Sequence, residues 1–226
     1  MIFNTEYKSY APHREPWANT VAYRPLESNW NDISGNNNNL SNSWTPVYTT
    51  VWWASVPSFN NTSNSNYLYS TSISWMTTGT SARTLNFWFY CSWTNSWYNN
   101  TLVMIGTASQ NNMLNAYFNA GSTTLAVSQY WSSSWNIITL STNTWYNIVL
   151  TYNWTAVKTY VNSELKNTWT YTINTQWNNI YLMQSSWNSN WYTKGNLSKL
   201  IFENKERTLD EITEYYNNTK SIYWIS

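Results

Sequence analysis

The sequence predicts an all-β protein, a sandwich of two antiparallel sheets with one short helix near the C-terminus. Strand-forming segments are short and frequent, and breaks rich in Asn, Ser and Thr separate them at the spacing typical of sandwiches and barrels. Apolar and polar residues alternate within these segments, so each strand offers one apolar face to a core. The chain of 226 residues is long enough to bury such a core as one large domain.

Alternation is clearest in two segments. In 84–91 one face carries the apolar residues Leu85, Phe87 and Phe89. The other face carries Asn86, Trp88 and Tyr90. In 145–153 the alternate positions are again apolar or aromatic, so one apolar inner face per sheet and two-layer packing follow. In chain order, we expect strands at 21–26, 67–71, 84–91, 101–107, 113–119, 124–130, 145–153, 156–162, 179–184 and 196–202.

The chain changes character after Lys194, where nearly half of its charged residues follow. Thr208-Leu209-Asp210-Glu211 is a capping box, and apolar residues at helical spacing come after it, which predicts a helix over 208–219. Between 28 and 66 strand signals are few, and we expect long loops there. The expected organisation is an N-terminal tail (1–19), one domain (20–220) and a C-terminal tail (221–226).

Three segments, 21–40, 145–167 and 192–220, together resemble the laminin-G-like part of the concanavalin A-like lectin/glucanase superfamily. In that family an aromatic-led strand ends in a Tyr-Asp-Gly turn, the next strand ends in an Asn-Gly hairpin turn, and a Gly-led strand precedes a short helix that begins with Leu and carries Glu-Ile. The matching places here are Trp145 to Tyr152, Val157 to Asn162, Gly195 to Phe202 and Leu209 to Ile212. The resemblance implies a two-sheet antiparallel jelly roll over roughly 20–220. It says little about function, because lectins, glycosidases, adhesion modules and virion proteins share this fold.

The chain departs from the family at its turns. Tyr152-Asn153-Trp154 replaces Tyr-Asp-Gly, and Asn162-Ser163 replaces Asn-Gly. A turn that needs a positive φ tolerates Gly and then Asn, whereas a bulky aromatic residue is strained there. The whole chain has 18 Trp and only 5 Gly, although ordinary usage predicts about 16 Gly.

We hypothesise that most of these tryptophans are UGA codons of a source that reads UGA as Gly. The alternative is a genuinely Trp-rich carbohydrate binder. Under either interpretation the neighbours of these residues are turn formers, so we expect five of them to be at least partly exposed in loops. They are Trp30, Trp154, Trp169, Trp177 and Trp187.

Composition excludes several classes of function. Charged residues make up 9% of the chain, with 11 Lys+Arg against 10 Asp+Glu, so a nucleic acid partner is not expected. One Cys and one His exclude a disulfide framework and a His-rich metal site, and Cys91 is expected to be a buried structural thiol. A glycosidase of this fold needs two neighbouring carboxylates, yet no Asp or Glu lies between Ile33 and Val157. We therefore expect no catalytic residues and no enzyme.

The expected ligand is a glycan, because flat aromatic faces flanked by amides suit sugar rings and their hydroxyls. The outward residues of the central strands have this character and would line one sheet face if those strands are neighbours. The alternative is that Trp88 and the tyrosines are ordinary packing aromatics. A second candidate surface is formed by the loop tryptophans Trp93, Trp97, Trp131 and Trp135. The ligand-binding candidates are Asn86, Trp88, Tyr90, Asn115, Tyr117, Ser128 and Tyr130.

No cofactor is expected, although calcium is common in the wider family. Asp32 could join carbonyl oxygens at a calcium site, and the alternative is an Asx turn that opens a loop. The expected function is a non-catalytic, lectin-like surface or adhesion module that binds a glycan or host-surface polysaccharide. The alternative is a structural or decoration domain of a phage virion or tail, or of a bacterial surface assembly, whose partners are other virion or surface proteins.

Neither a membrane span nor the order of a secretory signal peptide is present in the sequence. We expect an extracellular surface or virion location that is reached by a route other than Sec export.

Overall fold

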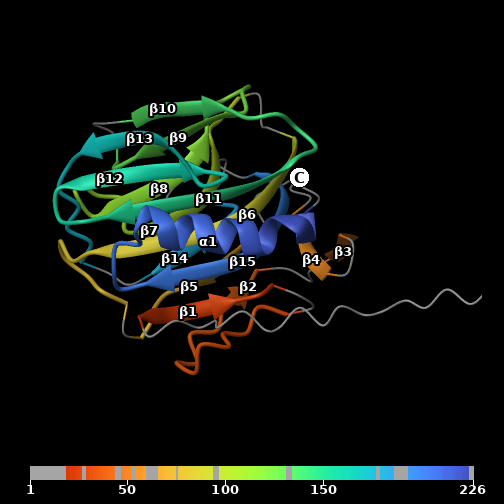
Figure 1. Ribbon diagram of the computed structural model, residues 1–226, viewed down its shortest axis with the longest axis horizontal. Helices are drawn as coiled ribbons and strands as arrows, with labels where there is room; N and C mark the ends of the chain where they lie inside the picture. The colour runs from red at the N-terminus through yellow and green to blue at the C-terminus, as the bar shows by residue number, and fades with distance from the viewer. Residues whose placement is uncertain are drawn as a thin grey trace, which may run out of the picture.

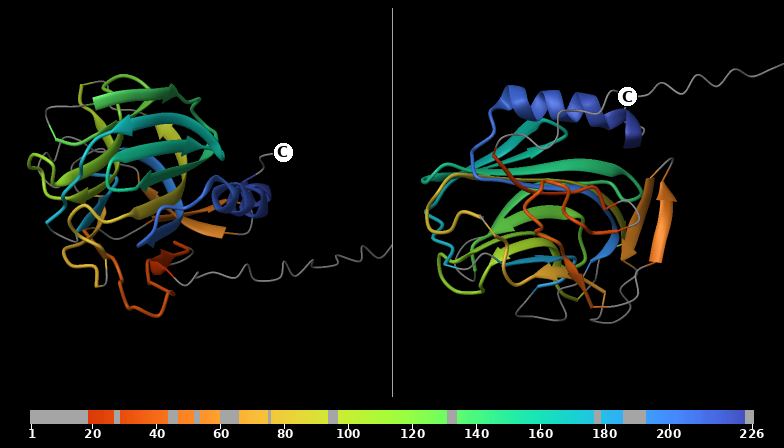
Figure 2. Two further views of the ribbon diagram at one scale, coloured as in Figure 1. Left: turned by 60° about the vertical axis from the view of Figure 1, so that its left-hand side comes forward. Right: turned by 90° about the horizontal axis from the view of Figure 1, so that it is seen from below.

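Two antiparallel sheets pack face to face, and a helix lies on the outer surface of one of them (Figures 1 and 2). The computed structural model describes residues 19–26, 29–43, 47–51, 54–59, 66–74, 76–93, 97–130, 134–176, 179–185 and 193–223. Within them, no helix is both long enough and apolar enough to cross a membrane. The predicted two-sheet jelly roll with one short C-terminal helix is confirmed.

Sheet A has the strand order β13-β12-β11-β6-β15-β4-β3, and β1 pairs with β15 beside β4. Its strands are β1 (Thr20–Arg24), β3 (Val47–Val51), β4 (Ala54–Phe59), β6 (Arg83–Trp93), β11 (Trp145–Tyr152), β12 (Ala156–Val161), β13 (Glu164–Thr170) and β15 (Lys194–Glu203).

Sheet B has the order β10-β9-β8-β7-β14-β5-β2. Its strands are β2 (Ser41–Asn42), β5 (Leu68–Ser70), β7 (Asn100–Gly106), β8 (Met113–Phe118), β9 (Thr124–Ser128), β10 (Ser134–Thr139) and β14 (Ile180–Leu182).

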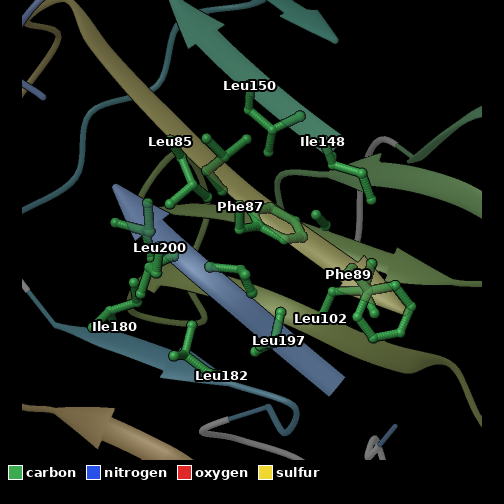
Figure 3. Close-up of a cluster of buried hydrophobic side chains, with 14 of the residues drawn as sticks. Leu85, Phe87, Phe89, Leu102, Ile148, Leu150, Ile180, Leu182, Leu197 and Leu200 are labelled. Carbon is green, nitrogen blue, oxygen red and sulfur yellow. The ribbon is translucent and has the colours of Figure 1, made fainter. Parts of the chain in front are cut away.

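The core lies between the sheets and is built from the alternate apolar residues that the sequence identifies. Leu85, Phe87 and Phe89 of β6 face the leucines and isoleucines of the neighbouring strands and of sheet B (Figure 3). All are buried, and burial of each such side chain contributes about 1.5–3 kcal/mol. Cys91 continues the same inward face and is buried in the core, as expected.

The predicted helix forms at the predicted place. Helix α1 (Leu209–Thr219) has Thr208 as its N-cap, and both hydrogen bonds of the capping box are present. A short 3₁₀ turn, η1 (Lys220–Tyr223), follows, and the Tyr223 ring stacks on Trp88 with 4.1 Å between ring centroids. The packed body therefore extends past 220, where the sequence places the start of the C-terminal tail.

Three strands lie in the region where the sequence predicts only loops. They are β2, β3 and β4, and they were missed because their residues do not follow a regular apolar alternation, and β4 also contains Pro57. The strands β10 and β13 were missed as well. Both are the last strands of their sheets, so each pairs with one strand only and fewer of its positions need to be apolar.

The tryptophans divide between turns and core. Trp154 is 60% exposed and Trp30 is partly exposed, as predicted. Trp169 is buried instead, because it lies on β13 opposite Val157, packs into the core and contacts the Tyr171 ring. Trp177 and Trp187 lie outside the described residues. Trp169 thus corrects the interpretation that all five are turn residues.

Candidate functional site

The predicted ligand-binding face is divided between the two sheets. Asn86, Trp88 and Tyr90 belong to β6 of sheet A, whereas Asn115 and Tyr117 belong to β8, and Ser128 to β9, of sheet B. All six point away from the shared core, and the outer surfaces of two packed sheets lie on opposite sides of the molecule. The prediction of one continuous face is therefore wrong.

The sheet A half is packing surface beneath α1. Trp88 is fully buried, and its Nε1–H donates to Thr219 Oγ1 at 3.2 Å. Asn86 is fully buried too, and its Oδ1 accepts from Asn147 Nδ2 at 2.7 Å. Tyr90 is partly exposed and contacts the Trp145 ring. The alternative interpretation of Trp88, as an ordinary packing aromatic, is correct.

The sheet B half stays together but is covered. Asn115, Tyr117 and Ser128 are all buried on the outer face of the sheet. The two ends of the connection between β14 and β15 pack onto β7 of the same sheet, where Thr193 Oγ1 donates to the Thr101 carbonyl at 2.7 Å and Ser185 Oγ lies 3.7 Å from Met104 Sδ. Tyr130 lies in the turn after β9 with φ 54° and is partly exposed.

Three tyrosines that the sequence analysis did not select form a partly exposed aromatic surface on sheet B. We call Tyr67, Tyr69 and Tyr181 the tyrosine cluster. Their ring centroids lie 5.6 Å (Tyr67 to Tyr69), 6.1 Å (Tyr69 to Tyr181) and 6.4 Å (Tyr67 to Tyr181) apart, and the rings of Tyr69 and Tyr181 are within 14° of parallel. All three are partly exposed.

Strand pairing explains why the three rings meet. Tyr69 of β5 and Tyr181 of β14 are direct cross-strand partners, and Leu68 and Leu182 beside them point into the core. Tyr67 precedes Leu68, so it shares the outward side with Tyr69. Its backbone is held by Ser43, whose Oγ accepts from Tyr67 N at 3.1 Å. Rigid strands therefore position the cluster, and the exposed residues Ser41 and Asn42 of β2 border it.

The phenol groups of the cluster influence one another. The pKa of Tyr181 is raised, first because the group is partly buried and then because Tyr67 and Tyr69 would repel its phenolate. The Tyr181 side chain is therefore a neutral phenol at neutral pH. All three residues carry a phenol ring with one hydroxyl. Each presents a ring face for stacking and a hydroxyl that both donates and accepts hydrogen bonds.

A row of paired residues connects the cluster with the predicted sheet B residues. Tyr181 pairs with Met104 of β7, Met104 with Asn115 of β8, and Asn115 with Ser128 of β9. In the described part of the chain neither amide atom of Asn115 has a hydrogen-bond partner, although the side chain is fully buried. Asn115 is thus an unsatisfied amide two strands away from the tyrosine cluster.

Charge is absent from this sheet. None of the seven described strands of sheet B contains Asp, Glu, Lys, Arg or His, whereas the strands of sheet A carry all the charged strand residues. These described strands supply no pair of carboxylates for glycoside hydrolysis and no cation for an anionic ligand. Their chemistry suits an uncharged ligand with many hydroxyl groups.

Asp32 organises a loop. Its Oδ1 accepts from Tyr23 N at 2.9 Å and Ser34 N at 3.0 Å, and its Oδ2 accepts from Asn38 N at 2.9 Å and Ser34 Oγ at 2.8 Å. A calcium ion would have to displace these donors, so Asp32 fits the Asx turn better than a metal site. Among the described residues no group of three or more His, Cys, Asp or Glu side chains could hold a metal ion.

The second candidate surface is described only in part. Trp97 is 84% exposed in the connection between β6 and β7. Trp131 lies outside the described residues, and the side chains of Trp93 and Trp135 lie outside them as well.

The tyrosine cluster has a recognisable signal in the sequence. Tyr67-Leu68-Tyr69 and Ile180-Tyr181-Leu182 both alternate aromatic and aliphatic residues inside predicted strands. What the sequence does not show is that β5 and β14 are neighbours, since the two segments are far apart in the chain.

Comparisons with known proteins agree on the fold. The sequence model of the concanavalin A-like lectin/glucanases superfamily matches residues 61–213. Among solved structures, domain 4 of AbnA, an extracellular GH43 arabinanase from Geobacillus stearothermophilus in complex with arabinotriose, is similar with a TM-score of 0.69 at 15% identity, over 87% of this chain and 97% of that one.

Binding domains of botulinum neurotoxins are similar as well. The serotype G domain has a TM-score of 0.70 at 12% identity over 90% of this chain. The binding domain of botulinum neurotoxin DC, in complex with rat synaptotagmin II, has a TM-score of 0.69 at 13% identity over 91% of this chain. This chain spans about half of these toxin domains, 52% in both cases. No curated protein matches the sequence.

Proposed function

Because the chain belongs to the concanavalin A-like lectin/glucanases superfamily, we propose that it is a non-catalytic carbohydrate-binding domain whose site is the tyrosine cluster on sheet B. The observation that carries the proposal is the cluster itself, three partly exposed rings fixed by strand pairing on a sheet without charged residues. Aromatic rings stack on the apolar faces of sugars, and neutral hydroxyls exchange hydrogen bonds with sugar hydroxyls.

The absence of charge narrows the ligand to neutral glycans. An anionic sugar would need a Lys or Arg near the rings, and the strands of sheet B supply none. Hydrolysis would need two carboxylates, and these strands supply none either. The arabinotriose complex of the similar arabinanase domain lends support from a protein of the same fold.

The proposed role is attachment at an extracellular surface or on a virion, with a neutral polysaccharide as the partner. A small, partly exposed site of this kind is expected to bind with micromolar to millimolar affinity, about −8 to −4 kcal/mol. We propose that binding needs no calcium, because hydrogen-bond donors already engage both oxygens of Asp32.

The test is a screen of neutral polysaccharides and oligosaccharides, followed by titration calorimetry with Tyr69→Ala and Tyr181→Ala. Each substitution removes one ring of the stacked pair, so each is expected to weaken binding about tenfold or more while the melting temperature stays close to that of the wild type. Chelation with EDTA is expected to leave the affinity unchanged.

The matched control is Tyr90→Ala, which removes a partly exposed tyrosine from the opposite sheet. It is expected to bind like the wild type. Loss of binding in Tyr90→Ala, with Tyr69→Ala and Tyr181→Ala unaffected, would move the site to sheet A. A wild type that binds no glycan up to millimolar concentration would favour the structural or decoration role instead.

A further inference from the structure

Four of the five strand edges that end the two sheets are protected against pairing with another chain. On β13 an exposed ion pair, Glu164 with Lys166, puts charge on the edge. The strand β2 is only two residues long, and β10 lies beside β13 where the margins of the two sheets meet (Figure 1). Charge, shortness and coverage are the usual means by which proteins blunt sheet edges.

The fourth protected edge is β1, which a loop covers. Ile33 N donates to the Tyr23 carbonyl at 2.8 Å, and Asn38 Nδ2 donates to the Val21 carbonyl at 2.8 Å. Arg24 fixes this loop by donating from Nε to the Asn38 carbonyl at 2.8 Å, and burial lowers the pKa of Arg24 to about 10. The backbone of β1 therefore has partners on both sides.

The remaining edge is β3, and in the described part of the chain no strand other than β4 pairs with it. It forms the outer strand of the hairpin that stands at the margin of sheet A (Figure 2). Its sequence, Val-Tyr-Thr-Thr-Val, contains no charge and no proline, and Val47 is 64% exposed. A strand with this composition at an open edge is suited to pairing with another strand.

The pairing of β3 with β4 shows which backbone groups face the free side. Tyr48 lies opposite Pro57, and the Pro57 carbonyl accepts from Asn196 Nδ2 of β15 at 3.2 Å, on the side away from β3. In an antiparallel sheet, two residues opposite each other either both point their N–H and C=O groups toward each other or both point them away. Pro57 points its carbonyl away from β3, so Tyr48 points its N–H and C=O away from β4. Tyr48 and, two residues on, Thr50 therefore present N–H and C=O to the free edge.

The sequence of β3 is nearly symmetrical about Thr49. If two copies pair antiparallel about that residue, Val47 lies opposite Val51 of the second copy and Tyr48 lies opposite Thr50 of the second copy. Thr49 then faces its own equivalent. Pairs of β-branched residues and of an aromatic with a β-branched residue are favourable across strands. Tyr48 and Thr50 of each copy would exchange four backbone hydrogen bonds with the other copy.

We propose that β3 is a self-association edge, at which two copies of this chain pair antiparallel about Thr49 and join their A sheets into one continuous sheet. The inference rests on the strand edges and is independent of the proposed glycan site. An interface built on five-residue strands is small, so the dimer is expected to be weak, with a dissociation constant in the micromolar range or higher.

The first test is a cross-link at the centre of the interface. Paired Thr49 residues would have Cα atoms about 4.5 Å apart, which a disulfide can span. Thr49→Cys is expected to form a covalent dimer under mild oxidation. Thr168→Cys, at an exposed position on the charged edge β13, is the control and is expected to stay monomeric. The native Cys91 is buried and does not take part.

The second test measures association by sedimentation equilibrium from micromolar to near-millimolar concentrations. Thr49→Lys places two like charges directly opposite each other and is expected to raise the dimer dissociation constant about tenfold or more, while Thr168→Lys leaves it unchanged. A monomeric wild type over the whole range, a dimer that persists in Thr49→Lys, or equal cross-linking at both cysteines would overturn the proposal.

Discussion

At the scale of single residues, Trp154 shows how a backbone requirement can conflict with a side chain. It occupies the turn between β11 and β12 with φ 74°, where the related family has Gly. The side chain itself has room, since it is 60% exposed. The conflict therefore lies in the backbone conformation, which costs a residue other than Gly about 1 kcal/mol or more.

At two of the five glycines there is no space for a side chain. A Cβ at Gly106 would lie 2.0 Å from the Asn112 carbonyl oxygen, and a Cβ at Gly195 would lie 2.1 Å from that of Tyr90. No side chain fits at these two positions. Trp154 differs because its side chain points into open space, so the fold tolerates it.

Replacing Trp154 with Gly is expected to stabilise the protein by about 1 kcal/mol, because the strained φ is relieved and little buried area is lost. Urea denaturation of the two proteins measures the difference. Trp97→Gly is the control, since it also removes an exposed indole, and it is expected to be neutral or slightly destabilising.

If Trp154→Gly destabilises the protein, the backbone of Trp154 is not strained, and the result also counts against the UGA hypothesis. That hypothesis is a prediction about the codons of the gene. A UGG codon at Trp154 would end that hypothesis. Trp169 already limits it, because a buried tryptophan on a core strand has a structural use of its own.

At the scale of elements, the β12–β13 hairpin is a close test of turn chemistry. Val161 pairs with Glu164, so the loop is two residues long, and Asn162 and Ser163 both have positive φ, 51° and 64°. These angles are those of a type I′ turn, for which Asn-Gly is the preferred sequence. Asn162 fits, and its Oδ1 also accepts from Asn147 N at 2.9 Å. Ser163 is the strained member.

Ser163→Gly is therefore expected to stabilise the protein by about 1 kcal/mol in chemical denaturation. Ser141→Gly, at an exposed loop serine whose φ is not positive, is expected to have no effect or to destabilise slightly. Equal effects of the two substitutions would show that Ser163 carries no strain.

Elements with strong local signals could be predicted from the sequence. The alternation in β6 and β11 and the capping box of α1 each depend on neighbouring residues, so their positions follow from local physics. The hairpin of β3 and β4 could not be predicted, because an edge strand needs little apolar alternation and β3 gains its place only through pairing with β4.

At the scale of the whole molecule, the candidate site could be predicted in chemistry but not in place. The sequence interpretation expected aromatic rings beside neutral polar groups, and the proposed site, the tyrosine cluster, is a surface of that chemistry on other residues. The error came from treating β6, β8 and β9 as neighbours, whereas the chain crosses from sheet A to sheet B between β6 and β7. Sheet membership depends on contacts between distant segments, and alternation within one strand carries no information about it.

The segregation of charge gives the molecule two different sides. Sheet A, with α1 and its ion pairs such as Lys158 with Glu206, carries the charged strand residues, and sheet B carries none. If two copies pair along β3, the two-fold axis runs perpendicular to the joined sheet, because antiparallel neighbours keep their side-chain faces on common sides. The two B sheets, and with them both tyrosine clusters, would face the same way, apart from the twist between strands.

This geometry predicts that the two weak sites act together on a surface. On an immobilised neutral polysaccharide the wild type is expected to bind at least tenfold more tightly than Thr49→Lys, because its second site binds at a high effective concentration. For a soluble oligosaccharide that reaches only one site, calorimetry is expected to give the same affinity for both proteins. Equal binding of the two proteins to the surface, with the wild type shown to be dimeric, would mean that the tyrosine clusters do not face a common plane. A difference with the soluble sugar would instead place the binding site at the β3 edge itself.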